Sequence, residues 1–156
     1  MGTKAQEIVG MKVEELVEQL NRAYADEWLA FYQYWVAAQI ASGRGSQPVV
    51  EELERIADEE LEHAEELAQR IVQLGGKPLP HPKLWLEKAN CGYSEPPAPR
   101  DLEKLIQTSI EAERCAASVY QKLAALTHGK DHVTYQLVGH ILAEELNHED
   151  AFENLL

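Results

Sequence analysis

The stretch Asp58-Glu59-Glu60-Leu61-Glu62-His63 decides how the rest of this chain is interpreted. Residues three apart on a helix share a face, so Glu60 and His63 project in the same direction. The residues that flank them on that face recur at steps of three and four, which is typical of the core-facing stripe of an amphipathic helix: Leu53, Ile56, Leu67, Ile71 and Leu74. A carboxylate and an imidazole therefore stand where leucine is the ordinary choice. Burying a charge there costs several kcal/mol unless something compensates it.

The composition is that of an ordinary globular protein, and we expect residues 1–156 to form a single domain, with 45% apolar and 26% charged residues. Asp and Glu number 27 against 14 Lys and Arg, a formal net charge of −13. This balance argues against binding to nucleic acid and suits a protein that handles cations, although solubility alone also explains it. No apolar run is long enough to span a membrane, and the N-terminus lacks a signal-peptide pattern. We therefore expect a cytoplasmic protein with no membrane partner.

Helical periodicity predicts four long helices, from about 13 to 42, 48 to 74, 100 or 101 to 126, and 134 or 135 to 155. Residues 77–99 hold six of the seven prolines and are too long for a tight helical hairpin. They predict a crossover with room for one short helix around 82–89. The fold class is therefore all-α, a four-helix bundle with a long crossover between its second and third helices.

The two halves of the chain repeat the same polar residues at nearly the same spacing. The single glutamates are 86 residues apart and the two Glu-x-x-His motifs are 85 apart. Facing helices bring four carboxylates and two imidazoles into one core layer: Glu27, Glu60, His63, Glu113, Glu145 and His148. One Glu-x-x-His alone is more often a solvated pair, but the matched set predicts a dinuclear metal site. Two divalent ions balance four carboxylates, and this ligand set suits iron, manganese or zinc. Tyr34 and Tyr120, two turns beyond the single glutamates, are interpreted as core residues.

With these residues the chain resembles the ferritin-like superfamily over essentially its whole length. Glu27-Trp-Leu-Ala-Phe-Tyr-Gln-Tyr34 and Glu60-Leu-Glu-His63-Ala are most similar to bacterioferritin. The resemblance implies a ferroxidase, in which two Fe(II) ions per subunit each pass one electron to hydrogen peroxide or oxygen, with manganese as the other metal to consider. It also implies that Glu27 and His63 are terminal ligands of one metal, Glu113 and His148 of the other, with Glu60 and Glu145 bridging.

Two departures separate the chain from bacterioferritin. Leu61 stands where the methionine that ligates haem is found in that family, so we expect no haem. The sequence ends eight residues after His148, so we expect no fifth helix of the kind that supports a 24-subunit shell.

The two cysteines, Cys91 and Cys115, make the chain most similar to a narrower group, the Dps-like proteins or thioferritins. Members of that group combine a bacterioferritin-type di-iron site with a Dps-type homododecamer and a nearby cysteine pair. This resemblance implies that Cys91, in the crossover, pairs with Cys115 as redox cysteines. Two residues correspond to about 200° around a helix, so Cys115, two residues after Glu113, is expected to face away from the metals and towards the crossover. Two unrelated buried thiols are the alternative.

The leading hypothesis is a ferroxidase that stores iron, consumes peroxide and limits oxidative stress. One alternative is a rubrerythrin-like or manganese-catalase-like peroxidase without mineral storage. Another is a Dps-type DNA-protecting protein. We consider DNA binding less favoured, because residues 1–15 offer only Lys4 and Lys12 against three glutamates.

Overall fold

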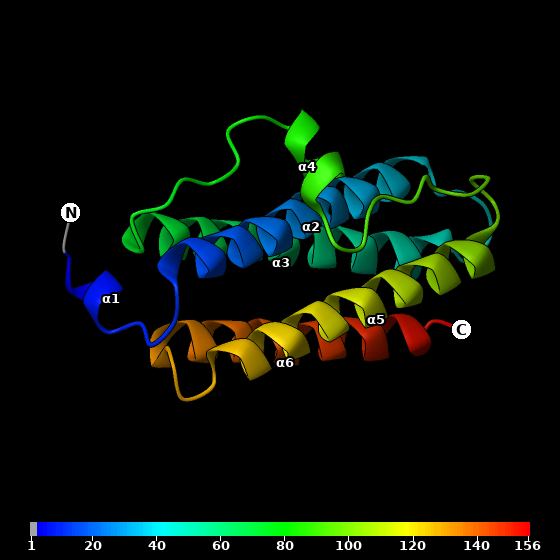
Figure 1. The fold of residues 1–156 in the computed structure, drawn as a ribbon. Helices are drawn as coiled ribbons and strands as arrows, with labels where there is room; N and C mark the ends of the chain where they lie inside the picture. The colour runs from blue at the N-terminus through cyan, green and yellow to red at the C-terminus, as the bar shows by residue number, and fades with distance from the viewer. Residues whose placement is uncertain (1–2) are drawn as a thin grey trace.

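The chain folds into helices alone over residues 3–156, which are those described by this computed structural model (Figure 1). Four long helices form the bundle: α2 (Val13–Ile40), α3 (Ser46–Gln73), α5 (Leu102–Thr127) and α6 (His132–Glu153). Two short helices, α1 (Lys4–Glu7) and α4 (Lys83–Lys88), lie outside it. The predicted fold class is confirmed, including the crossover between the second and third long helices. Within this range no helix combines the length and apolar character needed to cross a membrane.

The helix boundaries depart from the prediction by about two residues where local contacts override periodicity. Helix α2 ends at Ile40 because Ala41 is extended and the Ser42 N–H donates to the carbonyl of Pro99, 2.8 Å away. Helix α5 begins after Asp101, whose carboxylate accepts the Lys104 N–H as an N-cap. The short helix α1 was not predicted, since four residues are too few to show a period.

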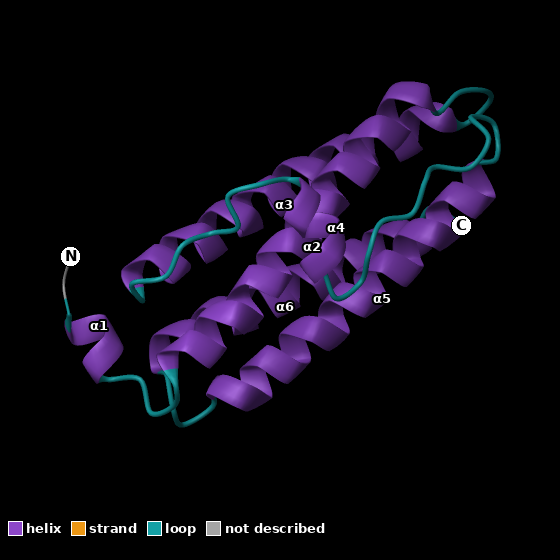
Figure 2. Cartoon of the chain, turned by 45° about the horizontal axis from the view of Figure 1, so that its top comes forward, coloured by secondary structure: helices purple, strands orange, loops and turns teal. Residues whose placement is uncertain are grey.

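The long helices are arranged as two antiparallel hairpins, α2 with α3 and α5 with α6 (Figure 1). The crossover leaves the end of α3, runs along the outside of α2 and reaches the start of α5 at the opposite end of the bundle (Figure 2). Helix α4 is held against α2 by Trp85, whose ring stacks on that of Trp28 with centroids 4.8 Å apart. The crossover is thereby held beside the middle of α2.

The apolar core is divided into two clusters by a layer of buried polar residues. One cluster lies towards the end of the bundle where α2 ends and includes Tyr34, Leu53, Ile56, Ile106 and Phe152. The other lies towards the start of α2 and includes Leu16, Leu20, Leu67, Ile71 and Ile141. The polar layer between them carries the residues that the sequence analysis selected as metal ligands.

Candidate metal centre

The six predicted ligands converge at the middle of the bundle, one from each of α2 and α5 and two from each of α3 and α6. All six are at most 2% exposed: Glu27, Glu60, His63, Glu113, Glu145 and His148. Their ligand atoms form two groups whose members lie within 4.8 Å of one another. Glu27 and His63 belong to one group, Glu113 and His148 to the other, and Glu60 and Glu145 to both. This is the geometry of two adjacent cation positions with two shared carboxylates.

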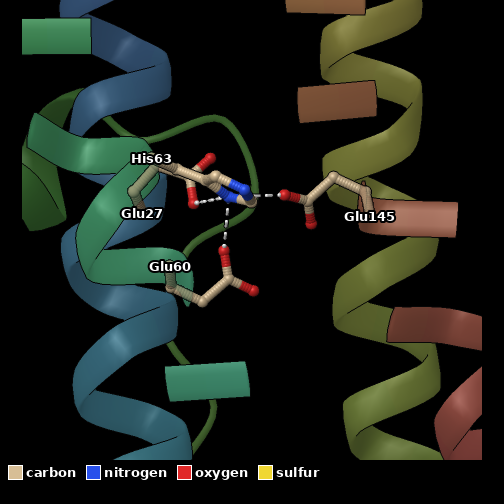
Figure 3. A group of neighbouring side chains, drawn as sticks. All are labelled: Glu27, Glu60, His63 and Glu145. Atoms are coloured by element: carbon tan, nitrogen blue, oxygen red, sulfur yellow. Dashed lines mark hydrogen bonds and ion pairs between the residues drawn. The ribbon is translucent and has the colours of Figure 1, made fainter. Parts of the chain in front are cut away.

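The imidazole of His63 shows how tightly one group is gathered (Figure 3). Its Nδ1 lies 3.1 Å from Glu145, 3.2 Å from Glu60 and 3.5 Å from Glu27, measured to the nearest carboxylate oxygens. In the second group, Nδ1 of His148 lies 3.4 Å from Glu60 and 3.6 Å from Glu113. Each imidazole therefore directs the same nitrogen at the carboxylates of its own group.

Several polar atoms in this layer are buried without a hydrogen-bond partner. They have only ion-pair contacts, with the imidazoles or carboxylates of the same layer: Oε1 of Glu60, Oε2 of Glu113, both carboxylate oxygens of Glu145 and Nδ1 of His148. Buried polar atoms in folded proteins are nearly always paired, and leaving one unpaired costs about 1–3 kcal/mol. Cations supply the missing partners, since all of these atoms are ligand types for iron, manganese or zinc. The donor set therefore fits a pair of divalent ions.

Burial and mutual repulsion shift the pKa values of the carboxylates. Burial, together with the charges of Glu27 and Glu113, raises the pKa of Glu60 to about 8. Burial and the charges of Glu60 and Glu27 also raise the pKa of Glu145 well above its ordinary value. Both shifts favour protons on the two shared carboxylates when no other cation is present.

The two imidazoles shift towards the protonated form. Burial opposes a charge on His148, but the carboxylates of Glu113 and Glu60 outweigh it and raise its pKa to about 10. The pKa of His63 is also raised, because Glu145, Glu27 and Glu60 outweigh the cost of burial. Metal binding must therefore displace protons from this layer, because only a neutral imidazole can ligate.

Two tyrosines each donate a hydrogen bond to a single glutamate of the layer, which connects α2 with α5. The sequence did not predict this role. The hydroxyl of Tyr34 donates to Oε1 of Glu113, and that of Tyr120 donates to Oε1 of Glu27. Both tyrosines are also core residues, as predicted, with 1% exposure. Each hydroxyl donates to one carboxylate oxygen, and the other oxygen faces the histidine of its own ligand group. The signal was their 86-residue separation, the same as that of the glutamates.

Two outer carboxylates were missed altogether. Glu144 lies 2.6 Å from Nε2 of His63, and Glu59 lies 2.6 Å from Nε2 of His148. Their side chains are about one-third exposed, at 34% and 33%. They are 85 residues apart, the same spacing as the Glu-x-x-His motifs, and this spacing could have identified them.

Cys91 and Cys115 form a disulfide, with Cα atoms 5.9 Å apart. The alternative of two unrelated thiols is therefore wrong, whereas a redox role remains a prediction. Neither cysteine belongs to the two ligand groups. The carboxylate of Asp26, beside Glu27, accepts hydrogen bonds from the Cys91 N–H and the Asn90 side chain. The crossover is thus fixed to the helix turn that carries Glu27.

A small cavity lies between this part of the crossover and the ligand layer. Its volume is about 30 Å³. Its walls include Cys91 and Gly92 from the crossover, Ala112 from α5, and the predicted ligands Glu60 and Glu145. A cavity needs about 10–15 Å³ to hold one water molecule, so this one admits a molecule of one or two heavy atoms.

The helical bundle and the paired carboxylate layer define a ferritin-like protein. The chain belongs to the family described as the ferritin-like domain, which matches residues 17–156. It is 36% identical over 150 residues to the DNA protection during starvation protein of Pyrococcus furiosus, a match covering 96% of this chain and 81% of that protein.

Among solved structures the chain is similar to a dodecameric thioferritin, the bacterioferritin-related protein from Bacteroides fragilis. The TM-score is 0.95 with 40% sequence identity, covering 99% of this chain and 92% of that one. Bacterioferritin from Desulfovibrio desulfuricans is 28% identical over 142 residues, covering 90% of this chain and 74% of that protein. The resemblance to Dps-like and bacterioferritin-related proteins that the sequence indicated is confirmed.

Proposed function

We propose that this chain is a ferroxidase, which oxidises Fe(II) at the intra-bundle carboxylate layer with hydrogen peroxide or oxygen as the electron acceptor. The observation that carries the proposal is the pair of overlapping ligand groups sharing Glu60 and Glu145. Two Fe(II) ions bring four positive charges to four buried carboxylates, so the loaded layer is close to neutral. Iron is the substrate at this site, and manganese would bind the same oxygen and nitrogen ligands.

The side chains divide the work of holding two ions. Glu27 and His63 are terminal ligands of one ion, and Glu113 and His148 are those of the other. Glu60 and Glu145 bridge. Each tyrosine hydroxyl donates to one oxygen of a terminal glutamate, which favours binding of the ion through the other oxygen and so leaves coordination positions open on the ions. Open positions are what a ferroxidase needs, because the oxidant must approach both ions.

The oxidation balances with one peroxide for each pair of ions. Two Fe(II) ions lose one electron each, the peroxide O–O bond breaks, and two protons complete two water molecules. The cavity of about 30 Å³ beside Glu60 and Glu145 has room for a molecule with two heavy atoms, such as peroxide or oxygen. No haem is proposed, because Leu61 offers no ligand atom at the position next to Glu60.

The test is Fe(II) oxidation by the full-length protein and by the variants Glu27→Ala and His148→Ala. Both variants should lose rapid oxidation while keeping the assembled particle, because each removes a ligand without altering the helix surface. Glu62→Ala, one residue before His63 but exposed, is the matched control and should oxidise iron at the wild-type rate. Wild-type kinetics in either ligand variant would overturn the site assignment.

We propose that the assembly is a homododecamer that stores the oxidised iron and removes peroxide. The thioferritin with 40% identity is described as dodecameric. Twelve chains of 17.6 kDa give a particle of about 210 kDa. A dimer that turns over peroxide without accumulating mineral would instead favour a rubrerythrin-like or manganese-catalase-like peroxidase. Native mass measured together with iron content after aerobic loading separates the two.

Binding to DNA is a second candidate, favoured by the name of the Pyrococcus furiosus relative. The charge of this chain opposes it, since a formal net charge of −13 repels the phosphate backbone. We expect no shift of duplex DNA in a gel at low salt. A tight complex under those conditions would overturn this expectation and support the DNA-binding candidate.

A further inference from the structure

The two ligand histidines are each held from the opposite helix by a carboxylate that is not itself a ligand. His63 on α3 is met by Glu144 on α6, and His148 on α6 is met by Glu59 on α3. Both contacts join Nε2 to a carboxylate oxygen at 2.6 Å. The remaining ring nitrogen, Nδ1, is the one directed at the metal positions. The two outer glutamates therefore connect α3 and α6 in a crossed pattern.

This geometry determines which nitrogen can bind a metal. An ionised carboxylate can only accept a hydrogen bond, so Nε2 of each histidine must carry the hydrogen. In the neutral imidazole the lone pair is then on Nδ1, facing the carboxylate layer. A carboxylate that accepts the far N–H of a ligand histidine also fixes the ring orientation and makes the ligating nitrogen more basic.

The outer glutamates are themselves held in place. Glu59 accepts from the Arg55 side chain through Oε1 at 2.7 Å, which leaves Oε2 for His148. Glu144 has His140 on its own helix, with Nε2 3.5 Å from the oxygen that faces His63. Neither outer glutamate belongs to the two ligand groups. Each contacts a ligand histidine at Nε2, the nitrogen that faces away from the two ligand groups.

We propose that Glu59 and Glu144 are positioning residues, each presenting the Nδ1 lone pair of the histidine on the opposite helix and so controlling metal binding at that histidine's position. The inference rests on the proposed dinuclear site. Its specific consequence is that each outer glutamate controls the metal position of the histidine on the opposite helix, which we call crossed control. Glu59 lies on the same helix as His63, yet it governs the position formed by His148 and Glu113. Glu144 lies on the helix of His148, yet it governs the position formed by His63 and Glu27.

The test uses the full-length protein, anaerobic Co(II) as the probe, and the variants Glu59→Leu and Glu144→Leu. Leucine keeps the size of the side chain and removes the acceptor. Loss of such an outer contact typically lowers metal affinity by about 10–100-fold. Each variant should therefore weaken one of the two Co(II) ions by that factor in a calorimetric titration and leave the other ion unchanged. Both side chains are partly exposed, so helicity by circular dichroism should match the wild type.

The position of the lost ion is read from anomalous diffraction of Co(II)-loaded crystals. Glu59→Leu should empty the position beside His148, and Glu144→Leu that beside His63. A loss beside the histidine on the same helix, or an equal loss of both ions, overturns crossed control. Glu59→Gln and Glu144→Gln provide a second measurement, because an amide oxygen still accepts the Nε2–H and should restore most of the affinity. A merely structural role predicts neither selectivity nor rescue.

The control is Glu62→Leu, an exposed position on α3 beside His63, which should bind both ions like the wild type. If the outer variants also bind two Co(II) ions like this control, the inference is wrong while the ferroxidase proposal stands. If Co(II) loss is selective as described but the wild type does not oxidise Fe(II), the inference holds and the ferroxidase proposal fails.

Discussion

Removing the Cys91–Cys115 disulfide should lower the stability of the fold without removing the metal site. The bond joins residues 24 apart in the sequence, so it closes a loop of about that length in the unfolded chain. The chain-entropy relation gives a loss of about 3.5 kcal/mol for a loop of that size when the cross-link is removed. This is an upper value, because unfolded chains are already partly compact.

The assay is urea unfolding of the wild type and of the double variant Cys91→Ser/Cys115→Ser at one fixed protein concentration. With a slope of about 2 kcal/mol per molar urea, a loss of 3.5 kcal/mol lowers the midpoint by about 1.7 M. A groove of about 470 Å³ on the outer face is lined by Cys115 and Asn90, so a reductant can reach the bond. Reduced wild type should therefore unfold like the double variant, and reductant should not affect the double variant.

The double variant should still bind two Co(II) ions. Neither cysteine belongs to the ligand groups, and hydrogen bonds from Asn90 and the Cys91 backbone to Asp26 remain after the bond is broken. A midpoint shift of less than about 0.3 M would contradict the predicted stabilisation by the disulfide. Loss of Co(II) binding while the fold survives would contradict the predicted independence of the metal site. Loss of Co(II) binding would mean that Cys91 and Cys115 are needed for the protein to bind metal.

Three further predictions concern other parts of the bundle. Asp131→Asn should destabilise the protein by about 3 kcal/mol at neutral pH, because it leaves Arg70 buried without its charged partner. Burial opposes ionisation of Asp131, but hydrogen bonds from Thr134 and Arg70 outweigh it and lower its pKa in the fold. This stabilisation is therefore present above the ordinary pKa of about 3.9 and is lost as pH falls through the lowered value. The urea midpoints of variant and wild type should therefore differ at pH 7 and lie closer together at pH 3. Tyr120→Phe should lower the free energy of unfolding by about 1–3 kcal/mol, because it leaves a buried oxygen of Glu27 unpaired, and a midpoint equal to the wild type would contradict this. Trp85→Ala should speed hydrogen exchange in residues 83–92 while the bundle helices exchange at the wild-type rate, since it removes only the ring that stacks on α2.

The sequence predicted the bundle and the six-residue layer because both depend on periodicity. Helical periodicity identifies a glutamate on an apolar stripe wherever it lies along the helix. The repeat between the two halves of the chain then indicated which of these glutamates lie in one layer. The six ligand candidates consequently lie together in the structure as the pattern indicated, although their binding of metal is still a proposal. The pairing of Cys91 with Cys115 came from the family resemblance and not from spacing.

The outer shell of the site was less accessible to sequence reasoning. Glu59 and Glu144 are charged residues on partly exposed helix faces, where glutamate is ordinary, so their 85-residue spacing did not by itself distinguish them from other surface glutamates. The hydrogen bonds of Tyr34 and Tyr120 join α2 to α5. Periodicity places each tyrosine on the core face of its helix, but it does not show which side chain on the other helix the hydroxyl contacts. The end of α2 depended on a single backbone hydrogen bond from Ser42 to Pro99, which is a tertiary contact.

The repeat that relates α3 to α6 is imperfect beside the two outer glutamates, where the difference changes the local charge. Arg55 and His140 occupy equivalent positions, 85 residues apart, and each lies beside an outer glutamate. A guanidinium is permanently charged and contacts Glu59 at 2.7 Å, whereas the imidazole lies 3.5 Å from Glu144. The two proposed metal positions therefore have the same types of ligand but differ in electrostatic field. Identical ions placed in them should be distinguishable by spectroscopy, and the two halves of the site need not fill in the same order or hold an electron equally well.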